Sequence, residues 1–162
     1  MRFETRAFPG IGTVSGRWVG ATGELRSYRP LPGPLDPVLH VRFLGERVWG
    51  SAPYPEMAAL GGRRSLPGYR SGRFLGNSAV AASALVRVDL FDVKTLGGLG
   101  FGTYLAGAAG RVWLDDVDEP RTLHSAWGGG VYLRVRALDR SVSLTVMQGD
   151  RPRTYVRLGL PF

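Results

Sequence analysis

The stretch "WGGGVYLRVRAL", residues 127–138, alternates apolar side chains with glycine, tyrosine and arginine. Successive side chains of a β-strand point to opposite faces, so a period of two predicts a strand with two unlike faces. One face is apolar and carries Trp127, Val131, Leu133 and Val135. The other face is small or cationic and carries Gly128, Gly130, Tyr132, Arg134 and Arg136.

The same alternation recurs from end to end, in "VLHVRF" (38–43), "LVRVDLFDV" (85–93) and "TYVRLGLPF" (154–162). Helical periodicity is almost absent, so the chain is predicted to be all-β. Eight strands are expected near residues 2–9, 12–29, 37–49, 78–93, 97–114, 122–138, 140–148 and 153–162.

Short turns separate most of these strands, whereas the connection over residues 51–77 is by far the longest. With 162 residues, the chain is long enough for one domain, over residues 1–162. Long strands joined by alternating short and long connections suit an antiparallel up-and-down β-barrel of about eight strands. The expected fold is therefore such a barrel, with one long loop after the third strand.

Three features favour a transmembrane barrel. The polar face combines arginine with glycine and tyrosine, as expected where cations line a confined, hydrated lumen. Several expected strands reach about ten residues or more, against roughly five or six in globular proteins, and roughly nine to eleven cross a bilayer. An apolar row also ends on the aromatic Phe162. The residues expected to face the lumen are Arg42, Arg87, Asp89, Arg134, Arg136 and Arg157.

Three segments resemble the C-terminal half of the barrel in the BamA/TamA-like superfamily of bacterial surface antigens. They are "LGGRRSLPGYRSGRFLGN" (60–77), "GAAGRVW" (107–113) and "YVRLGLPF" (155–162). The family's loop signature, aliphatic-Arg-Gly-aromatic, reads here as Leu66, Pro67, Gly68 and Tyr69, followed by Arg70. The closing strand with its terminal aromatic reads as Tyr155, Val156, Leu158, Leu160 and Phe162.

The resemblance implies the last eight of the family's sixteen strands, a location in the bacterial outer membrane and a long loop that folds into the lumen. It also implies a role in inserting or translocating outer-membrane proteins, or in anchoring a fused passenger. The expected partners are outer-membrane lipid and unfolded outer-membrane protein clients or that passenger.

The chain departs from the family where the loop arginine meets a strand aspartate, because Pro67 and Ala108 occupy those two positions. Ala106 and Leu85 depart from the pattern as well. Losing both partners of a buried ion pair costs less than losing one, so we expect the lock to be missing rather than broken. Arg64, Arg70 and Arg73 are candidates for replacement bonds to Asp89 or Asp92.

Eight strands raise a geometric problem, because the interior of an eight-stranded barrel is filled by its own side chains. Either the loop lies outside the lumen, or two copies form a wider barrel, or the chain is half of a longer one. A closed monomer would pair every strand edge, as a bilayer requires. A monomer or a homodimer is expected.

The alternative is a soluble eight-stranded barrel of lipocalin type, whose apolar faces would line a cavity for an apolar ligand. The tryptophans, with Tyr28 and Tyr54, are either an interfacial girdle or ordinary core residues.

An enzyme is not expected. His124 and Ser125 are neighbours on a strand and point to opposite faces, and the chain has no Gly-x-Ser-x-Gly elbow. No cofactor or metal site is expected either, because the chain has two histidines and no cysteine. The acidic run 115–119 resembles a solvated turn.

The net charge of +8 comes from arginines spread singly along the chain with one lysine, Lys94, so nucleic acid is not an expected partner.

Overall fold

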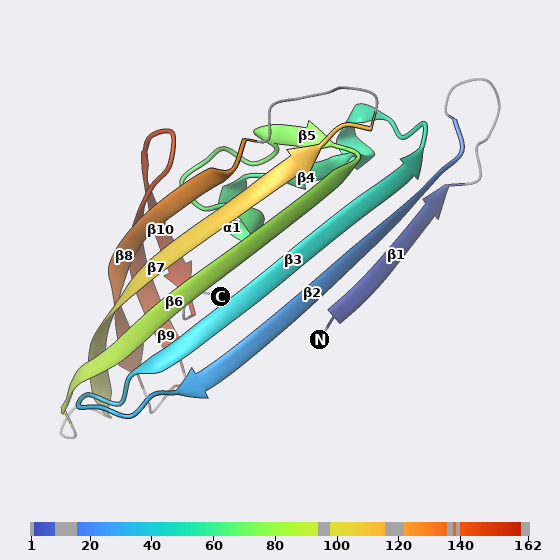
Figure 1. The fold of residues 1–162 in the computed structure, drawn as a ribbon. Coiled ribbons are helices and arrows are strands. Elements are labelled where there is room, and N and C mark those ends of the chain that lie inside the picture. Colours follow the sequence, from blue (N-terminus) through green and yellow to red (C-terminus); the bar gives the residue numbers. More distant parts are fainter. Residues whose placement is uncertain are drawn as a thin grey trace.

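The computed structural model describes residues 2–8, 16–93, 98–115, 122–135, 138 and 140–159. Within them, eight strands form one antiparallel sheet in chain order (Figure 1). The strands are β1 (Arg2–Phe8), β2 (Trp18–Pro30), β3 (Val38–Gly50), β6 (Ser78–Val93), β7 (Leu99–Trp113), β8 (His124–Val135), β9 (Arg140–Gln148) and β10 (Pro152–Leu158). The prediction of an all-β chain with eight antiparallel strands is confirmed.

The connection after β3, residues 51–77, has structure of its own and is called the inserted segment below. It contains the 3-10 helix η1 (Tyr54–Glu56), β4 (Ala58–Leu60), the one-turn helix α1 (Gly62–Ser65) and β5 (Phe74–Gly76). β4 and β5 pair in a second, two-stranded antiparallel sheet. Strands of three residues are too short to show a period, which is why the alternation of the sequence does not predict them.

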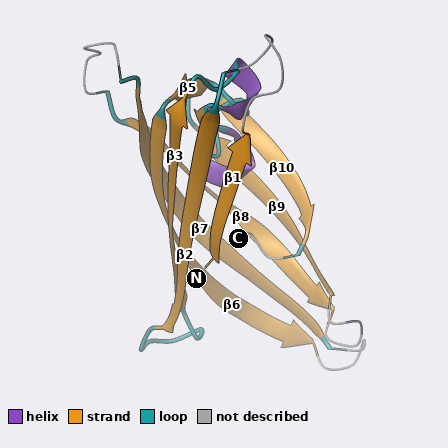
Figure 2. Ribbon diagram, turned by 90° about the vertical axis from the view of Figure 1, so that its right-hand side faces the viewer, coloured by secondary structure: helices purple, strands orange, loops and turns teal. Residues whose placement is uncertain are grey.

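The large sheet curves, so that β8, β9 and β10 lie behind β6 and β7 in Figure 1. The two helices of the inserted segment lie at one end of this curve, with β3 and β10 on opposite sides of the segment (Figure 2). We call the face of the sheet that contacts the inserted segment the concave face, and the other the convex face.

Two leucines of the inserted segment form a core with the concave face. Leu60 and Leu66 are both 0% exposed. They pack against small or flexible side chains of four different strands, namely Ala81, Ala108, Ala126 and Met147. Alanines at these positions leave the room that the two leucines fill, so the concave face accepts a segment as well as its own side chains.

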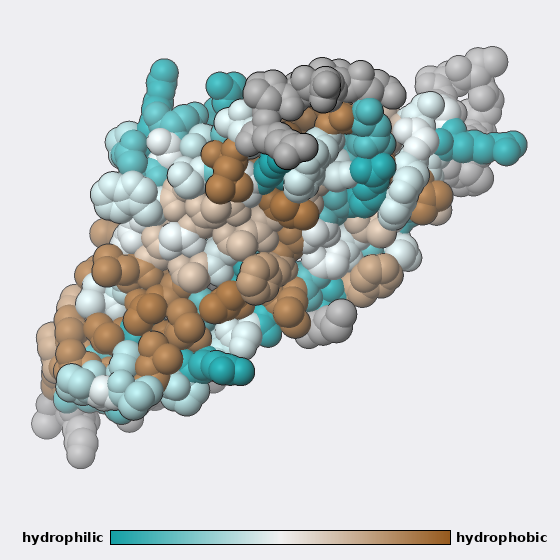
Figure 3. Space-filling model, in the orientation of Figure 1, coloured by the Kyte–Doolittle hydropathy of each residue, from teal (hydrophilic) through white to brown (hydrophobic). Residues whose placement is uncertain are grey.

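The apolar rows lie on the convex face and are exposed. Phe43, Leu105 and Val156 are 52%, 75% and 66% exposed, whereas Tyr104, next to Leu105, is 2% exposed. Figure 3 shows this face in the orientation of Figure 1, with apolar side chains over the strands and hydrophilic ones gathered towards the upper end. The long apolar rows therefore point outward, whereas Arg42, Arg87, Arg134 and Arg157 lie on the inward face.

The predicted closure of the barrel is not found. The described backbone contains no pairing between β1 and β10, and the sheet stays open along these two edges. Both edge strands have seven residues, whereas β6 has 16. An eight-stranded barrel has room only for its own side chains, whereas here the concave side also holds residues of the inserted segment.

β6 contains one irregularity, because its register with β7 shifts between Asp89 and Phe91. Leu90 is the additional residue, as in a β-bulge. Phe91 is thereby brought opposite Phe101, and the two rings stack with centroids 5.2 Å apart.

Two tyrosines of the concave face lie over glycines of the neighbouring strand. Tyr104 of β7 is paired with Gly130 of β8, and Tyr132 of β8 with Gly102 of β7. A Cβ atom on Gly130 would lie 2.5 Å from the Tyr104 hydroxyl oxygen and 2.1 Å from the Leu144 carbonyl oxygen. The missing side chain thus provides the space for the ring.

The substitution Gly130→Ala is expected to lower the free energy of unfolding by about 1–3 kcal/mol, because both the tyrosine and a neighbouring backbone must move. Urea unfolding followed by far-UV circular dichroism measures the change. Gly107→Ala is the matched control, since no atom lies within 4 Å of its Cβ position, and it is expected to change stability by less than about 1 kcal/mol. Equal losses in the two variants would contradict the packing argument.

Candidate functional site

The concave face encloses a cavity of about 350 Å³ between the inserted segment and the strands. Residues of both edge strands reach it, Arg2 from β1 and Tyr155 and Arg157 from β10. One side is apolar or small, with Leu85, Ala106, Ala108 and Met147. The other is cationic, with Arg26 and Arg42 from β2 and β3 and Arg63 and Arg64 from α1. Glu24 is the acidic residue of the lining.

Glu24 holds two of these arginines. The Nε atoms of Arg26 and Arg42 both donate to its Oε1 atom, the former at 2.7 Å. Glu24 is 6% exposed, and a buried carboxylate is stable only when it is paired and hydrogen-bonded. Arg42 also donates to the backbone carbonyl of Arg64. This arginine therefore links β3 to the inserted segment.

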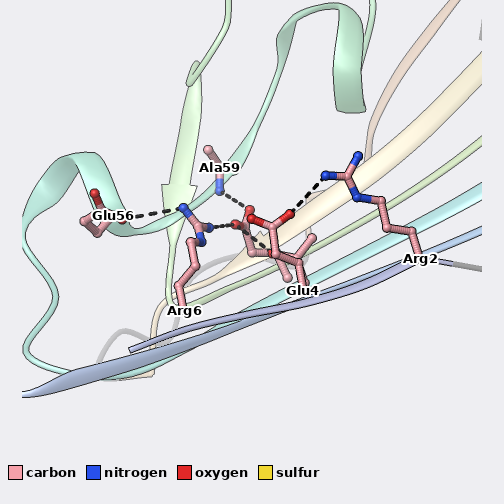
Figure 4. Close-up of polar contacts among 7 residues, drawn as sticks. Arg2, Glu4, Arg6, Glu56 and Ala59 are labelled. Carbon is pink, nitrogen blue, oxygen red and sulfur yellow. Dashed lines mark hydrogen bonds and ion pairs between the residues drawn. The ribbon is translucent and has the colours of Figure 1, made fainter. Parts of the chain in front are cut away.

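Glu46 of β3 is a second carboxylate with several donors. It accepts from Arg6 of β1 at 2.8 Å, from the Thr22 hydroxyl at 3.4 Å and from the backbone N–H of Ala59 at 3.2 Å. Arg6 also lies 3.5 Å from Glu56 of η1 (Figure 4). One carboxylate thus connects β1, β2 and the inserted segment.

The loop motif expected from the sequence is docked on the concave face. Gly68 has a φ of +100° and lies against the backbone of Gln148 and Gly149, where a Cβ would approach within 2.9 Å of a backbone nitrogen. Glycine is required there for both its conformation and its size. The Gly68 N–H donates to the Tyr155 hydroxyl at 3.0 Å, and the Tyr69 hydroxyl donates to the carbonyl of Ser125 at 3.1 Å.

The other motif positions divide between the core, the cavity and solvent. Leu66 is buried and Pro67 lines the cavity, while Arg70 is exposed. Ala108, which the sequence comparison pairs with Pro67, lines the same cavity. Pro67 and Ala108, which occupy the positions of the family's loop arginine and strand aspartate, thus line the same cavity.

Five of the six residues expected to face a lumen lie on the concave face, and Arg136 lies outside the described residues. Asp89 accepts from the Tyr132 hydroxyl and lies 3.8 Å from Arg134. The Nε and Nη1 atoms of Arg87 are buried without a hydrogen-bond partner among the described residues.

Among the described contacts, Asp89 is not bonded to any of the three candidate loop arginines, Arg64, Arg70 and Arg73. The described partners of the Asp89 carboxylate are Tyr132 and Arg134. Neither of them belongs to the inserted segment. The reason is position, because the inserted segment packs around Ala81 while Asp89 lies eight residues further along β6.

β10 pairs with β9 as the last strand of the sheet. Tyr155 points to the concave face, where it holds Gly68, and Val156 and Leu158 are exposed on the convex face. Leu160 and Phe162 lie outside the described residues.

The tryptophans differ in burial, since Trp18 is buried in a core whereas Trp49 is exposed on the convex face. Trp18 is 8% exposed and packs with Val48, Ala58 and Ala79 in a core cluster. Near the last residues of β3 and β7, on the convex face, arginine guanidinium groups lie over tryptophan rings. Arg47 lies 5.9 Å from the ring centroid of Trp49, and Arg111 lies 4.8 Å from that of Trp113.

The His124 ring stacks on Phe74 with centroids 3.7 Å apart, while Ser125 is exposed. Asp115 pairs with Arg47 at 2.9 Å, and residues 116–121 of the acidic turn lie outside the described ranges. The described residues contain no group of three or more side chains able to hold a metal ion. No helix in the described part of the chain is long and apolar enough to cross a membrane.

Sequence reasoning missed Glu24 and Glu46 as shared acceptors. The available signal was a carboxylate within the polar row of the second and third strands, on the same face as arginines. Their pairing needs the register between strands, which the alternation alone does not provide.

No protein-family model, curated protein or solved structure matches this chain.

The substitution Leu66→Ala is expected to lower the free energy of unfolding by about 2–5 kcal/mol, because it empties a fully buried position. It is also expected to release the inserted segment, which trypsin would then cut faster at its arginines. Leu105→Ala is the matched control, since Leu105 lies on the opposite face of the sheet and is 75% exposed, and it is expected to leave the rate of trypsin cleavage in the inserted segment unchanged. An unchanged cleavage rate in Leu66→Ala would contradict the docking described above.

Proposed function

We propose that this chain is a transmembrane β-barrel domain of the bacterial outer membrane, similar to the C-terminal part of BamA/TamA-like proteins. The observation that carries the proposal is the sidedness of the sheet. Apolar residues such as Leu105 and Val156 are exposed on the convex face, and arginines line the concave face. Water would oppose this arrangement, whereas lipid outside and a hydrated interior favour it.

The dimensions of the strands support the proposal. The five central strands β2, β3, β6, β7 and β8 have 13, 13, 16, 15 and 12 residues. A tilted strand needs roughly nine to eleven residues to cross a bilayer. Trp49 and Trp113, each beside an arginine, lie where the convex row turns from apolar to polar, which suits a membrane interface.

The likeness to BamA/TamA-like proteins is supported by the inserted segment. It follows the third strand, packs on the concave face and brings Pro67 and Ala108 to one cavity. On this basis the domain takes part in inserting or translocating outer-membrane proteins, or anchors a passenger in the membrane. Its partners are outer-membrane lipid and such a client or passenger.

A lipocalin-type site would need the apolar rows around the cavity. The cavity is instead lined by six arginines, Glu24 and a few apolar side chains, and the long apolar rows point away from it. This arrangement weighs against the binding of an apolar ligand inside the sheet.

The first test is refolding in plain buffer, in detergent micelles and in lipid vesicles, followed by far-UV circular dichroism and heat-modifiable gel mobility. A β spectrum with a mobility shift is expected only in detergent or lipid. A folded, monodisperse protein in plain buffer would overturn the membrane proposal.

The variant Leu105→Arg sharpens this test, because a charge on the lipid-facing side costs about 2–4 kcal/mol near the bilayer midplane. It is expected to reduce insertion into vesicles. Leu105→Phe also enlarges the side chain but keeps it apolar, and it is expected to insert as the unchanged protein does.

The unpaired edges of β1 and β10 need partners in a bilayer, because unsatisfied backbone groups cost several kcal/mol there. Arg2 and Arg157 line one cavity, so the two edges of a single chain lie around the same space. This favours closure of the edges on each other over pairing with a second copy.

The double variant Phe3→Cys with Val156→Cys tests this closure, since the chain has no cysteine of its own. Oxidation in vesicles is expected to give a cross-linked monomer on a non-reducing gel. The two single variants serve as controls and should not form that species. A covalent dimer from the double variant would show pairing between copies instead.

A further inference from the structure

The cavity on the concave face carries an excess of positive charge. Six arginines and one glutamate line it, and the arginines come from the strands β1, β2, β3 and β10 and from α1. The residues are Arg2, Arg26, Arg42, Arg63, Arg64 and Arg157. Five separate elements thus contribute an arginine to the lining of one partly open cavity, and Arg2, Arg26, Arg63 and Arg64 are also exposed to solvent.

The described carboxylates compensate only part of this charge. Glu24 pairs with both Arg26 and Arg42, so its single negative charge compensates only one of their two positive charges, and Arg2 lies 3.5 Å from the exposed Glu4. Among the described residues, no carboxylate pairs with the guanidinium of Arg63, Arg64 or Arg157. Arg26, Arg42, Arg63 and Arg157 line the same cavity, so their like charges oppose one another.

Like charges that line one cavity repel each other, and an anion bound between them relieves this repulsion. Guanidinium groups present fork-shaped pairs of donors that match the oxygens of phosphate, and several of them can surround one phosphate group. The small side chains of Ala106 and Ala108 on the opposite wall leave space for a group of this size.

We propose that this cavity binds a phosphate-type oxyanion, held by Arg63, Arg64 and Arg157, with Arg2 closing the site from β1. The bound anion is free phosphate or pyrophosphate, or the phosphate monoester of a lipid headgroup. Because Arg2 and Arg157 belong to the two edge strands, the same anion links the open edges of the sheet. This proposal rests on the residues that line the cavity. It therefore holds whether the domain is folded in a membrane, in detergent or in plain buffer.

The test is isothermal titration calorimetry of the full chain with sodium pyrophosphate at constant ionic strength, in zwitterionic micelles or in whichever medium keeps the protein folded. Saturable binding that sodium chloride does not reproduce is expected. A second arm adds phosphatidic acid to phosphatidylcholine micelles and records protein thermal stability. Binding in the first arm identifies a free anion, and an effect confined to the second identifies a lipid headgroup. Either result supports the site, and the absence of both overturns it.

The double variant R63Q with R157Q is expected to weaken binding by about a hundredfold, or about tenfold for each lost charged hydrogen-bond partner. The double variant R140Q with R151Q is the control matched for charge, because both arginines are exposed and neither lines the cavity. Binding by the control is expected to match the unchanged protein. If the double variant does not fold, R63Q and R157Q are titrated singly. Equal weakening in the cavity variants and the control would overturn the site, because it would show attraction by net charge alone.

Discussion

A single unbroken ladder of antiparallel pairs, from β1 to β10, governs the rest of the structure. Because each strand is paired residue by residue with the next, alternate side chains must fall on opposite faces along the whole sheet. A slip of one residue would bring Leu105 to the concave face and Tyr104 to the convex face. The bulge at Leu90 is the one described place in β6 where this order is relaxed, and beyond it Phe91 pairs with Phe101 of β7.

Bringing arginines to a concave face requires shared carboxylates and small neighbours. Glu24 and Glu46 each accept from more than one donor, and together they connect the first three strands to the inserted segment. On β6, β7 and β8 the same face carries Ala81, Ala108 and Ala126, against which Leu60 and Leu66 pack. One side of the interior is therefore held by charge and the other by apolar contact.

The strands and their two faces were predictable because a period of two is a local property, visible within ten residues of sequence. The structure inside residues 51–77 was not, since β4 and β5 are too short to show a period and depend on Leu60 packing under distant strands. The shared roles of Glu24 and Glu46 need the register between strands. The open edges were not predictable either, because alternation shows the two faces of a strand and not whether the first and last strands pair.

The docking of Gly68 has a consequence for the order of folding. Its N–H meets the hydroxyl of Tyr155, which lies 87 residues further along the chain. Contacts of such sequence separation form slowly, because a large loop must close before they contribute. The contact therefore joins the connection after the third strand directly to the last strand, and it can form only when the chain between them, from β6 to β9, has folded back on itself.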